Sequence, residues 1–298
     1  MIDEVADRFL SHLKTMRGVS EHTIRNYHSD LQRFFQTMNI DSINEVTRSQ
    51  LRIFIMQERE RGQSKRTVAR RVSALRTFFR YCVREKYISN NPMEDIEGPK
   101  LDRSVPHSLT YEQVSLFLSL PDVAAYLGLR DRAMMELFYS SGLRLSELVG
   151  LNKRDLDLDE MLMRILGKGN KERVIPITEN AAQWLQKYLV HPERMKKTSE
   201  HNAESDPQAV FLNRFGQRIS TRSIDRLFSS YFKRSGFAGT ITPHVIRHTI
   251  ATHWLEQGMD LKTIQLLLGH ASMATTTIYT EVSPELKKQA VLQHHPRA

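Results

Sequence analysis

Two residues of the sequence lie where they could bind a phosphate group. Thr242 and Pro243 are typical of the N-cap and first position of a helix. His244 and Arg247, three residues apart, would then share one face of that helix near its N-terminus. Free N–H groups and the helix dipole attract an anion to that end; both side chains can donate to it, and histidine can also carry a proton. The pattern is equally consistent with a helix surface that carries a structural histidine.

A zinc site is not expected on this helix, although His244 and His248 are four residues apart. The zinc-protease motif needs a glutamate directly after its first histidine, and Val245 stands there. The segment also lacks a cysteine partner, because the chain has one cysteine, Cys82. Cys82 falls on the apolar stripe of a predicted helix, so we expect it in the core and not as a catalytic thiol.

Four further residues could take part in phosphate chemistry, although each is weakly specific alone. Arg144 is flanked by apolar residues in GLRLSEL, and an inward arginine needs a carboxylate such as Glu147 or a bound anion. Lys168 in GKGNKER could be an ordinary turn lysine, because the spacing of a phosphate-binding loop is absent. His270 follows the glycine that ends a predicted helix in LLLGH. Tyr279 stands in a short segment, where a lone tyrosine is more often a packing residue than a nucleophile.

Taken together and in order, these residues resemble the motif set of the tyrosine recombinase (phage integrase) family. The set is complete: Arg144, Lys168, His244, Arg247, His270 and Tyr279. Its specificity comes from the ordered combination and not from any one motif. The compact size and the ending QHHPRA resemble the Xer subgroup of that family. One position departs from the subgroup, which often has histidine two residues after the tyrosine; this chain has Glu281 there, outside the six residues.

The resemblance implies an enzyme that cuts and rejoins DNA without a metal ion or another cofactor. Tyr279 would attack a backbone phosphorus, expel a 5′-hydroxyl and become a 3′-phosphotyrosine, so the phosphodiester energy is retained and ATP is not needed. The two arginines would stabilise the extra negative charge of the pentavalent transition state. Lys168 would protonate the leaving oxygen, and His244 would help to accept the tyrosine proton. His270 would bond the scissile phosphate.

The resemblance also implies partners and a cellular role. The substrate would be double-stranded DNA at a specific recombination site, bound together with a related recombinase subunit in a synaptic tetramer. The C-terminal helix, starting near Pro284, would dock on a neighbouring subunit through Leu286, Ala290 and Leu292. The role would be the resolution of chromosome dimers to monomers at cell division, in the cytoplasm, helped by a septal DNA translocase.

Three other interpretations stay open. An integrase or transposon recombinase of a mobile element would use the same six residues. A type IB topoisomerase shares the chemistry but would relax DNA as a monomer without a defined partner site. A catalytically silent DNA-binding regulator could have the same fold, although it would have no reason to keep the complete set.

The elements that must position these residues are mostly helical. Residues 1–88 carry helical apolar spacing and resemble the family's SAM-like, core-binding DNA-binding domain. Residues 89–106, where asparagine, proline and glycine accumulate and the apolar period stops, are predicted as a linker. Residues 107–298 resemble the catalytic domain. The expected fold is therefore mainly α, with a helical N-terminal domain and a mostly helical catalytic domain that contains a small antiparallel sheet.

Within the catalytic part, the period changes from helix to strand and back. Residues 161–166 and 173–177 are predicted as the two strands of a hairpin. Residues 211–215 are predicted as a short strand, and residues 192–208 as a polar, mobile loop. The predicted helix caps are Thr47 or Asp41 for one helix, then Ser64, Thr110 and Thr221.

The charge of the chain favours a polyanionic partner. There are 43 Lys and Arg against 34 Asp and Glu, a net charge of +9. The stretch from Arg61 to Arg84 has no acidic residue, so an external anion such as the DNA backbone is the simpler explanation of its cations. No apolar run approaches the roughly 18 residues that span a bilayer, so no membrane partner is expected. The predicted DNA contacts are Lys65, Arg66, Arg70, Arg71 and Arg76.

Overall fold

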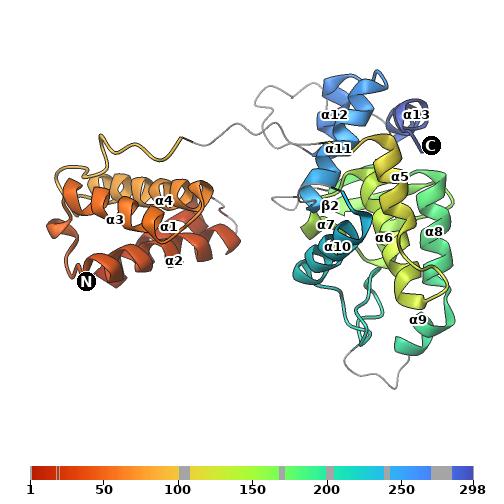
Figure 1. Cartoon of the computed structure of the whole chain (residues 1–298), viewed down its shortest axis with the longest axis horizontal. Coiled ribbons are helices and arrows are strands. Elements are labelled where there is room, and N and C mark those ends of the chain that lie inside the picture. The colour runs from red at the N-terminus through yellow and green to blue at the C-terminus, as the bar shows by residue number, and fades with distance from the viewer. Residues whose placement is uncertain are drawn as a thin grey trace. The chain divides into compact units, whose positions relative to one another are not determined.

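The computed structural model divides the chain into two compact units, Met1–Ser104 and Val105–Ala298 (Figure 1). It describes residues 2–17, 19, 21–100, 108–167, 172–198, 205–237, 242–269 and 284–297. Within these ranges both units are mainly helical, and none of the helices is long and apolar enough to cross a membrane.

The N-terminal unit is a set of helices packed around an aromatic core. Its helices are α1 (Ile2–Arg17), α2 (Glu21–Met38), α3 (Arg48–Glu60) and α4 (Lys65–Arg84), with a 3₁₀ turn, η1 (Ile43–Glu45). The rings of Phe9 and Phe78 are fully buried and meet edge to face, with centroids 5.4 Å apart. Cys82 lies in the same core, where burial raises the pKa of its thiol to about 12. The prediction that Cys82 is a core residue is confirmed.

Local capping signals determine where several helices begin. Thr47 forms a reciprocal capping box with Gln50 at the start of α3, so Thr47 and not Asp41 is the cap. The hydroxyl of Ser64 accepts from the backbone N–H of Thr67 at the start of α4. The predicted cap Thr110 likewise begins the first helix of the C-terminal unit. These predictions are confirmed. Each cap depends only on contacts within one helical turn, so residue type and spacing are enough to predict it.

The C-terminal unit combines helices with one small antiparallel sheet. Strand β1 (Leu156–Asp157) pairs with β2 (Leu162–Leu166), which pairs with β3 (Glu172–Pro176). Helix α6 is buried along nearly its whole length. The predicted fold class, mainly α with a small antiparallel sheet, is confirmed. The helices are α5 (Tyr111–Ser119), α6 (Tyr126–Ser141), α7 (Leu145–Gly150), α8 (Glu179–Leu189), α9 (Pro192–Lys197), α10 (Thr221–Ser235), α11 (Pro243–Glu256), α12 (Leu261–Leu268) and α13 (Pro284–His294), with a 3₁₀ turn, η2 (Lys153–Asp155).

The segment predicted as a polar loop begins with a helix instead. Pro192–Lys197 forms α9, and the side chain of His191 caps it by accepting from the N–H of Glu193. Arg194 anchors this helix, because its buried guanidinium donates to the carbonyls of Ala209 and Val210. Those carbonyls are remote in sequence, so the polar composition of the segment alone does not indicate the helix.

Two smaller predictions also differ from the structure. The described residues 211–215 form no strand, and Leu212 makes only an isolated bridge with Arg218. The cap of α10 is Ser220, one residue before the predicted Thr221, and its side-chain oxygen accepts from the backbone N–H of Ser223. Strand β1 is two residues long and carries no sequence signal of its own.

The described part of α13 packs on its own unit, against β3 and α12 (Figure 1). Val291 is 2 % exposed, whereas Leu292 is 50 % exposed. The side chain of His295 is also buried, and burial lowers its pKa to about 3, so it is neutral at physiological pH. Val291 thus fills the core of its own unit, whereas Leu292 stays exposed, so docking of Leu292 on a neighbouring subunit remains a prediction. The side chain of Leu286 lies outside the described residues.

Candidate active site

A glycine turn places Arg144 between the ends of three helices. Helix α6 ends at Gly142, whose φ of 58° is left-handed, and Arg144 is the N-cap residue of α7. A Cβ atom on Gly142 would lie 2.6 Å from Leu268 Cδ2 and 3.2 Å from Ile250 Cγ2. Glycine is thus required both for the turn and for the close approach of α11 and α12.

Arg144 is held by a buried carboxylate and a backbone carbonyl. Its guanidinium donates to Glu147 Oε1 at 2.9 Å and to the carbonyl of Gly269 at 2.5 Å. Its backbone N–H donates to Glu147 Oε2 at 2.8 Å. The side chain of Glu147 is 5 % exposed and that of Arg144 is 35 % exposed. The pairing expected from the sequence is present, and about a third of the Arg144 side chain remains exposed to solvent.

Arg247 comes from α11 and joins the same place from the other side. Its guanidinium donates to the carbonyl of Gly142 and, at 2.6 Å, to the carbonyl of Leu268. Burial, followed by the positive charge of Arg144, lowers the pKa of Arg247 to about 10. Arg247 therefore remains protonated at neutral pH. Two cations held this close repel each other, and a bound anion would relieve that repulsion.

Arg173 completes the cluster and was not expected from the sequence. It lies on β3, and its two terminal nitrogens donate to Glu147 Oε1 and Oε2, both at 2.8 Å. Burial acts to raise the pKa of Glu147, but the hydrogen bonds from Arg173 and Arg144 outweigh it, and the pKa is lowered. A buried glutamate with two oxygens to satisfy calls for more donors than Arg144 alone, and that was the available signal. Below, the arginine cluster means Arg144, Glu147, Arg173 and Arg247.

The remaining predicted residues differ in what the structure says about them. His244 lies exposed in the first turn of α11, one turn before Arg247. Thr242 occupies the N-cap position of that helix but makes no side-chain capping bond. Lys168, His270 and Tyr279 lie outside the described residues. Their roles stay predictions.

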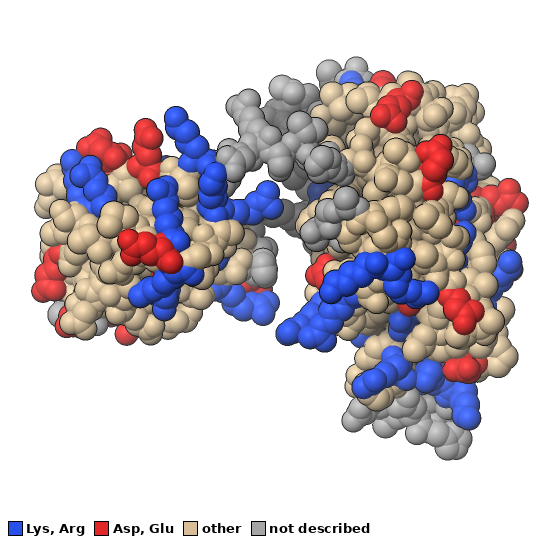
Figure 2. Space-filling model, viewed as in Figure 1, with Lys and Arg blue, Asp and Glu red and all other residues tan. Residues whose placement is uncertain are grey.

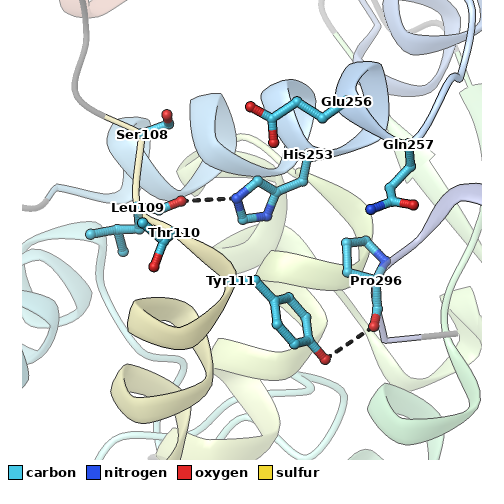
Figure 3. A pocket seen from close by; sticks show the side chains of 8 residues that line it. All are labelled: Ser108, Leu109, Thr110, Tyr111, His253, Glu256, Gln257 and Pro296. Carbon is cyan, nitrogen blue, oxygen red and sulfur yellow. Dashed lines mark hydrogen bonds between the residues drawn. The ribbon is translucent and has the colours of Figure 1, made fainter.

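A pocket of about 520 Å³ in the same unit lies apart from the arginine cluster (Figure 3). It opens between the start of α5, the end of α11 and the C-terminal residues. His253 shares a hydrogen bond of 2.8 Å with the carbonyl of Leu109, and the hydroxyl of Tyr111 donates to the carbonyl of Pro296 at 3.1 Å. None of the cluster residues lines this pocket. Its lining residues come from the first and last segments of the unit, and we do not take it as the candidate site.

In the N-terminal unit, buried carboxylates from neighbouring helices pair with the arginines of α4. Arg70 pairs with Asp30 of α2, and Arg71 pairs with Glu58 of α3 and, at 3.5 Å, with Asp30. Burial raises the pKa of Asp30 although both arginines act to lower it. Arg76 donates to the carbonyl of Ile96 at 2.6 Å. The expectation that these cations need an external anion is thus wrong for Arg70 and Arg71.

The two remaining predicted DNA contacts of α4, Lys65 and Arg66, lie exposed in the first turn of the helix. Arg33 and Arg61 also reach Glu58, at 3.3 Å and 3.1 Å. Figure 2 shows acidic side chains among the lysines and arginines on the visible face of this unit. More guanidinium groups than carboxylates meet at Asp30 and Glu58, so a positive charge remains there.

Comparison with known proteins shows similarity along almost the whole chain. Residues 107–285 match the Phage integrase family, and residues 6–86 match the Phage integrase, N-terminal SAM-like domain. "Tyrosine recombinase XerC" of Chlamydia pneumoniae is 50 % identical, with 97 % of this chain and 98 % of that protein covered. "Tyrosine recombinase XerC" of Thermodesulfovibrio yellowstonii is 41 % identical, with 97 % and 95 % covered.

Solved structures share the fold at lower identity. A lambda integrase tetramer bound to a Holliday junction aligns with a TM-score of 0.67 at 20 % identity, covering 94 % of this chain and 80 % of that one. The Tn1549 transposon integrase in complex with transposon right end DNA aligns with a TM-score of 0.69 at 20 % identity, covering 96 % and 97 %. These identities show the fold alone.

The compact size and the ending QHHPRA indicate the XerD member of the Xer subgroup. The Chlamydia pneumoniae and Thermodesulfovibrio yellowstonii relatives, however, are both named XerC. The ending is therefore a poor guide to the member within the subgroup, and the expectation of XerD is corrected. The described C-terminal residues give a physical reason. His295 is buried and Arg297 donates to Glu136 at 2.8 Å, so the ending serves the packing of this unit.

Proposed function

We propose that this chain, which belongs to the phage integrase family of tyrosine recombinases, is a site-specific DNA recombinase of the XerC type. The observation that carries the proposal is the convergence of Arg144 and Arg247 on the end of α12, where Arg144 bonds Gly269 and Arg247 bonds Leu268. Preorganised donors of this kind stabilise charge that develops in a transition state. The relatives named XerC support the assignment to this type.

The chemistry follows from the six motif residues. The oxygen of Tyr279 would attack the scissile phosphorus, and the bond to the 5′-oxygen would break, leaving a 3′-phosphotyrosine and a 5′-hydroxyl. Attack by the 5′-hydroxyl of another strand would reverse these bonds and release the tyrosine. Lys168 would give its proton to the leaving oxygen, and His244 would help to accept the tyrosine proton. His270 would bond the scissile phosphate.

The two arginines have donors left for a phosphate. A guanidinium carries five N–H donors, and Arg144 uses one on Glu147 and one on Gly269. Arg247 uses its donors on two backbone carbonyls of this unit. The remaining N–H groups would be free to donate to the non-bridging oxygens of a phosphate bound by the two side chains. Because both guanidinium groups are already positioned, little reorganisation is needed as the charge develops.

The two units would divide the work of binding and chemistry. The N-terminal unit would act as the core-binding domain and the C-terminal unit as the catalytic domain. Within the predicted linker 89–106, Met93 and Ile96 are buried in the N-terminal core, so the connection between the domains would lie after Ile96. The proposed substrate is double-stranded DNA at a recombination site, held by this chain and a related recombinase in a tetramer. A lambda integrase of similar fold is a tetramer on a Holliday junction, which supports that assembly. Chromosome dimer resolution with a septal DNA translocase is the role proposed from the XerC relatives.

DNA affinity should depend on salt through specific cations of α4. Arg66→Gln should lower the slope of log K against log salt by about one, because an exposed guanidinium releases about one counterion on binding. Arg76→Gln is the matched control: it has the same charge change on the same helix, but Arg76 is engaged with the carbonyl of Ile96. Fluorescence anisotropy over a salt series measures both slopes. Equal slopes for the two variants would contradict this division of roles.

The C-terminal helix should be needed for assembly more than for binding. Deleting residues 284–298 should abolish recombination and leave binding to a single site largely intact. Because Val291 is part of the core, the deletion also exposes apolar surface. Leu292→Asp is therefore the sharper variant, since Leu292 is exposed, with the exposed Gln293→Asp as its control. Recombination that is unchanged by both the deletion and Leu292→Asp would contradict subunit docking by α13.

A suicide substrate tests the proposed function as a whole. DNA that carries a candidate Xer-type site has a nick just downstream of the scissile phosphate, so that cleavage releases a short fragment with the new 5′-hydroxyl. Loss of that fragment prevents religation and traps the covalent intermediate. The protein, with a partner recombinase added, should form an adduct that survives denaturing electrophoresis and forms in EDTA. Binding of this DNA without any adduct, with the partner present, would favour the silent DNA-binding regulator instead.

A further inference from the structure

We propose that Arg173 is a positioning residue of the active site, which holds Glu147 in the orientation that fixes Arg144 for phosphate binding. The inference rests on the proposed function and adds to it a residue outside the six motif positions. Arg173 makes no contact with the reacting atoms in this account. It acts through Glu147 and Arg144.

The geometry around Glu147 leaves no spare acceptor. Oε1 accepts from the guanidinium of Arg144 at 2.9 Å and from Arg173 at 2.8 Å. Oε2 accepts from the backbone N–H of Arg144 at 2.8 Å and from Arg173 at 2.8 Å. Arg173 thus supplies one bond to each oxygen in a bidentate fork. Without it, half of the hydrogen bonds of a buried carboxylate are lost, and Glu147 is held only by its two bonds from Arg144.

A second contact ties Arg173 to the end of α12. Gly269 has a φ of 66°, and a Cβ atom on it would lie 2.9 Å from Cζ of Arg173. The guanidinium therefore packs directly on the backbone of a residue whose carbonyl accepts from Arg144. Arg173 itself lies on β3, and its guanidinium contacts Glu147 of α7 and Gly269 at the end of α12. These are the elements that carry Arg144 and that flank, in the chain, Lys168 and His270.

The charges that face Glu147 make the proposal testable by pH. They are Arg144 at the start of α7, Arg173 on β3 and Arg247 on α11. Lys287 of α13 faces Arg173 in turn, and burial followed by the charge of Arg173 lowers the pKa of Lys287. Burial alone acts to raise the pKa of Glu147. Removing Arg173 should therefore let Glu147 protonate at a higher pH, and a neutral Glu147 no longer holds the guanidinium of Arg144 as an ion pair.

The test compares Arg173→Gln, Arg173→Lys and the control Arg164→Gln on the nicked substrate. Arg164 is exposed on β2 and paired across the sheet with Val174, so the control makes the same charge change beside β3. Arg173→Gln should slow adduct formation by about 10- to 100-fold near pH 8, because a small displacement of a catalytic group has effects of that size. Its rate relative to wild type should fall further towards about pH 5.5. Arg173→Lys, which keeps the charge, should recover part of the rate and most of the pH profile.

Gly269→Ala gives an independent check if Arg173→Gln folds poorly. The added methyl group pushes on the guanidinium of Arg173 and should reproduce the steeper loss at low pH. A rate for Arg173→Gln within about 2-fold of wild type, or a loss equal at every pH that Arg173→Lys does not relieve, would overturn the proposal. Absence of a Tyr279-dependent adduct from the wild-type protein would instead overturn the proposed function, so the two failures are distinguishable.

Discussion

We expect Tyr279→Phe to abolish the covalent protein–DNA adduct and to lower recombination by roughly 10⁴-fold or more, while DNA affinity stays within about 2-fold of wild type. Phenylalanine lacks the oxygen that would form the bond to phosphorus in the proposed mechanism. The effect is larger than that of any electrostatic group, since the reaction has no alternative route. Adduct formation on the nicked substrate and binding by anisotropy are measured side by side.

A matched loss of a tyrosine hydroxyl serves as the control. Tyr111→Phe removes the hydrogen bond to the carbonyl of Pro296, in the pocket of Figure 3, and leaves the arginine cluster untouched. It should form adduct at close to the wild-type rate. An adduct that persists in Tyr279→Phe would contradict the assignment of the nucleophile.

Arg144→Gln and Arg247→Gln each slow cleavage by roughly 10²- to 10³-fold, on the order of 3 to 4 kcal/mol of transition-state stabilisation. Each removes a cation that is held in place by carbonyls of Gly142, Leu268 or Gly269. The double variant should lose less than the sum of the two free energies, because both side chains would act on one phosphate. Single-turnover cleavage of the nicked substrate gives the three rates.

The control must separate lost chemistry from lost structure. Arg218 also donates to two backbone carbonyls of this unit, those of Val149 and Leu151, and pairs with Asp206. Arg218→Gln should therefore lower the thermal stability of the protein by an amount similar to that of the active-site variants, as measured by thermal unfolding. It should keep a cleavage rate within about 5-fold of wild type. A cleavage defect in Arg218→Gln as large as that in Arg247→Gln would show that the effect is one of folding.

The features that the sequence predicts well are local ones. Thr47, Ser64 and Thr110 cap helices through contacts within one turn, so residue type and spacing are sufficient. Cys82 is correctly placed in the core by the apolar period of its helix. Arg144 and Glu147, three residues apart, form the expected pair. For the wider site, the ordered motif set predicts both Arg144 and Arg247 as site residues, and both donate to carbonyls at the end of α12.

The features that the sequence misses depend on partners from distant segments. Asp30 and Glu58 satisfy Arg70 and Arg71 from other helices, so the acid-free run of α4 suggested unpaired cations. Arg173 meets Glu147 across 26 residues of chain. The predicted face of α13 leaves out Val291, whose burial in its own unit is set by how the helix packs on β3 and α12. Tertiary packing decides each of these cases.

Peptide mapping of the trapped adduct tests the central claim most directly. The wild-type protein is incubated in EDTA with a nicked substrate and a partner recombinase, the adduct is digested with nuclease and protease, and the modified peptide is sequenced by tandem mass spectrometry. The account predicts a nucleotide 3′-phosphate on the oxygen of Tyr279, with all the adduct at that residue. A nucleotide on another residue, or an adduct that forms only after a divalent metal is added, would contradict the mechanism built on Arg144, Arg247 and Tyr279.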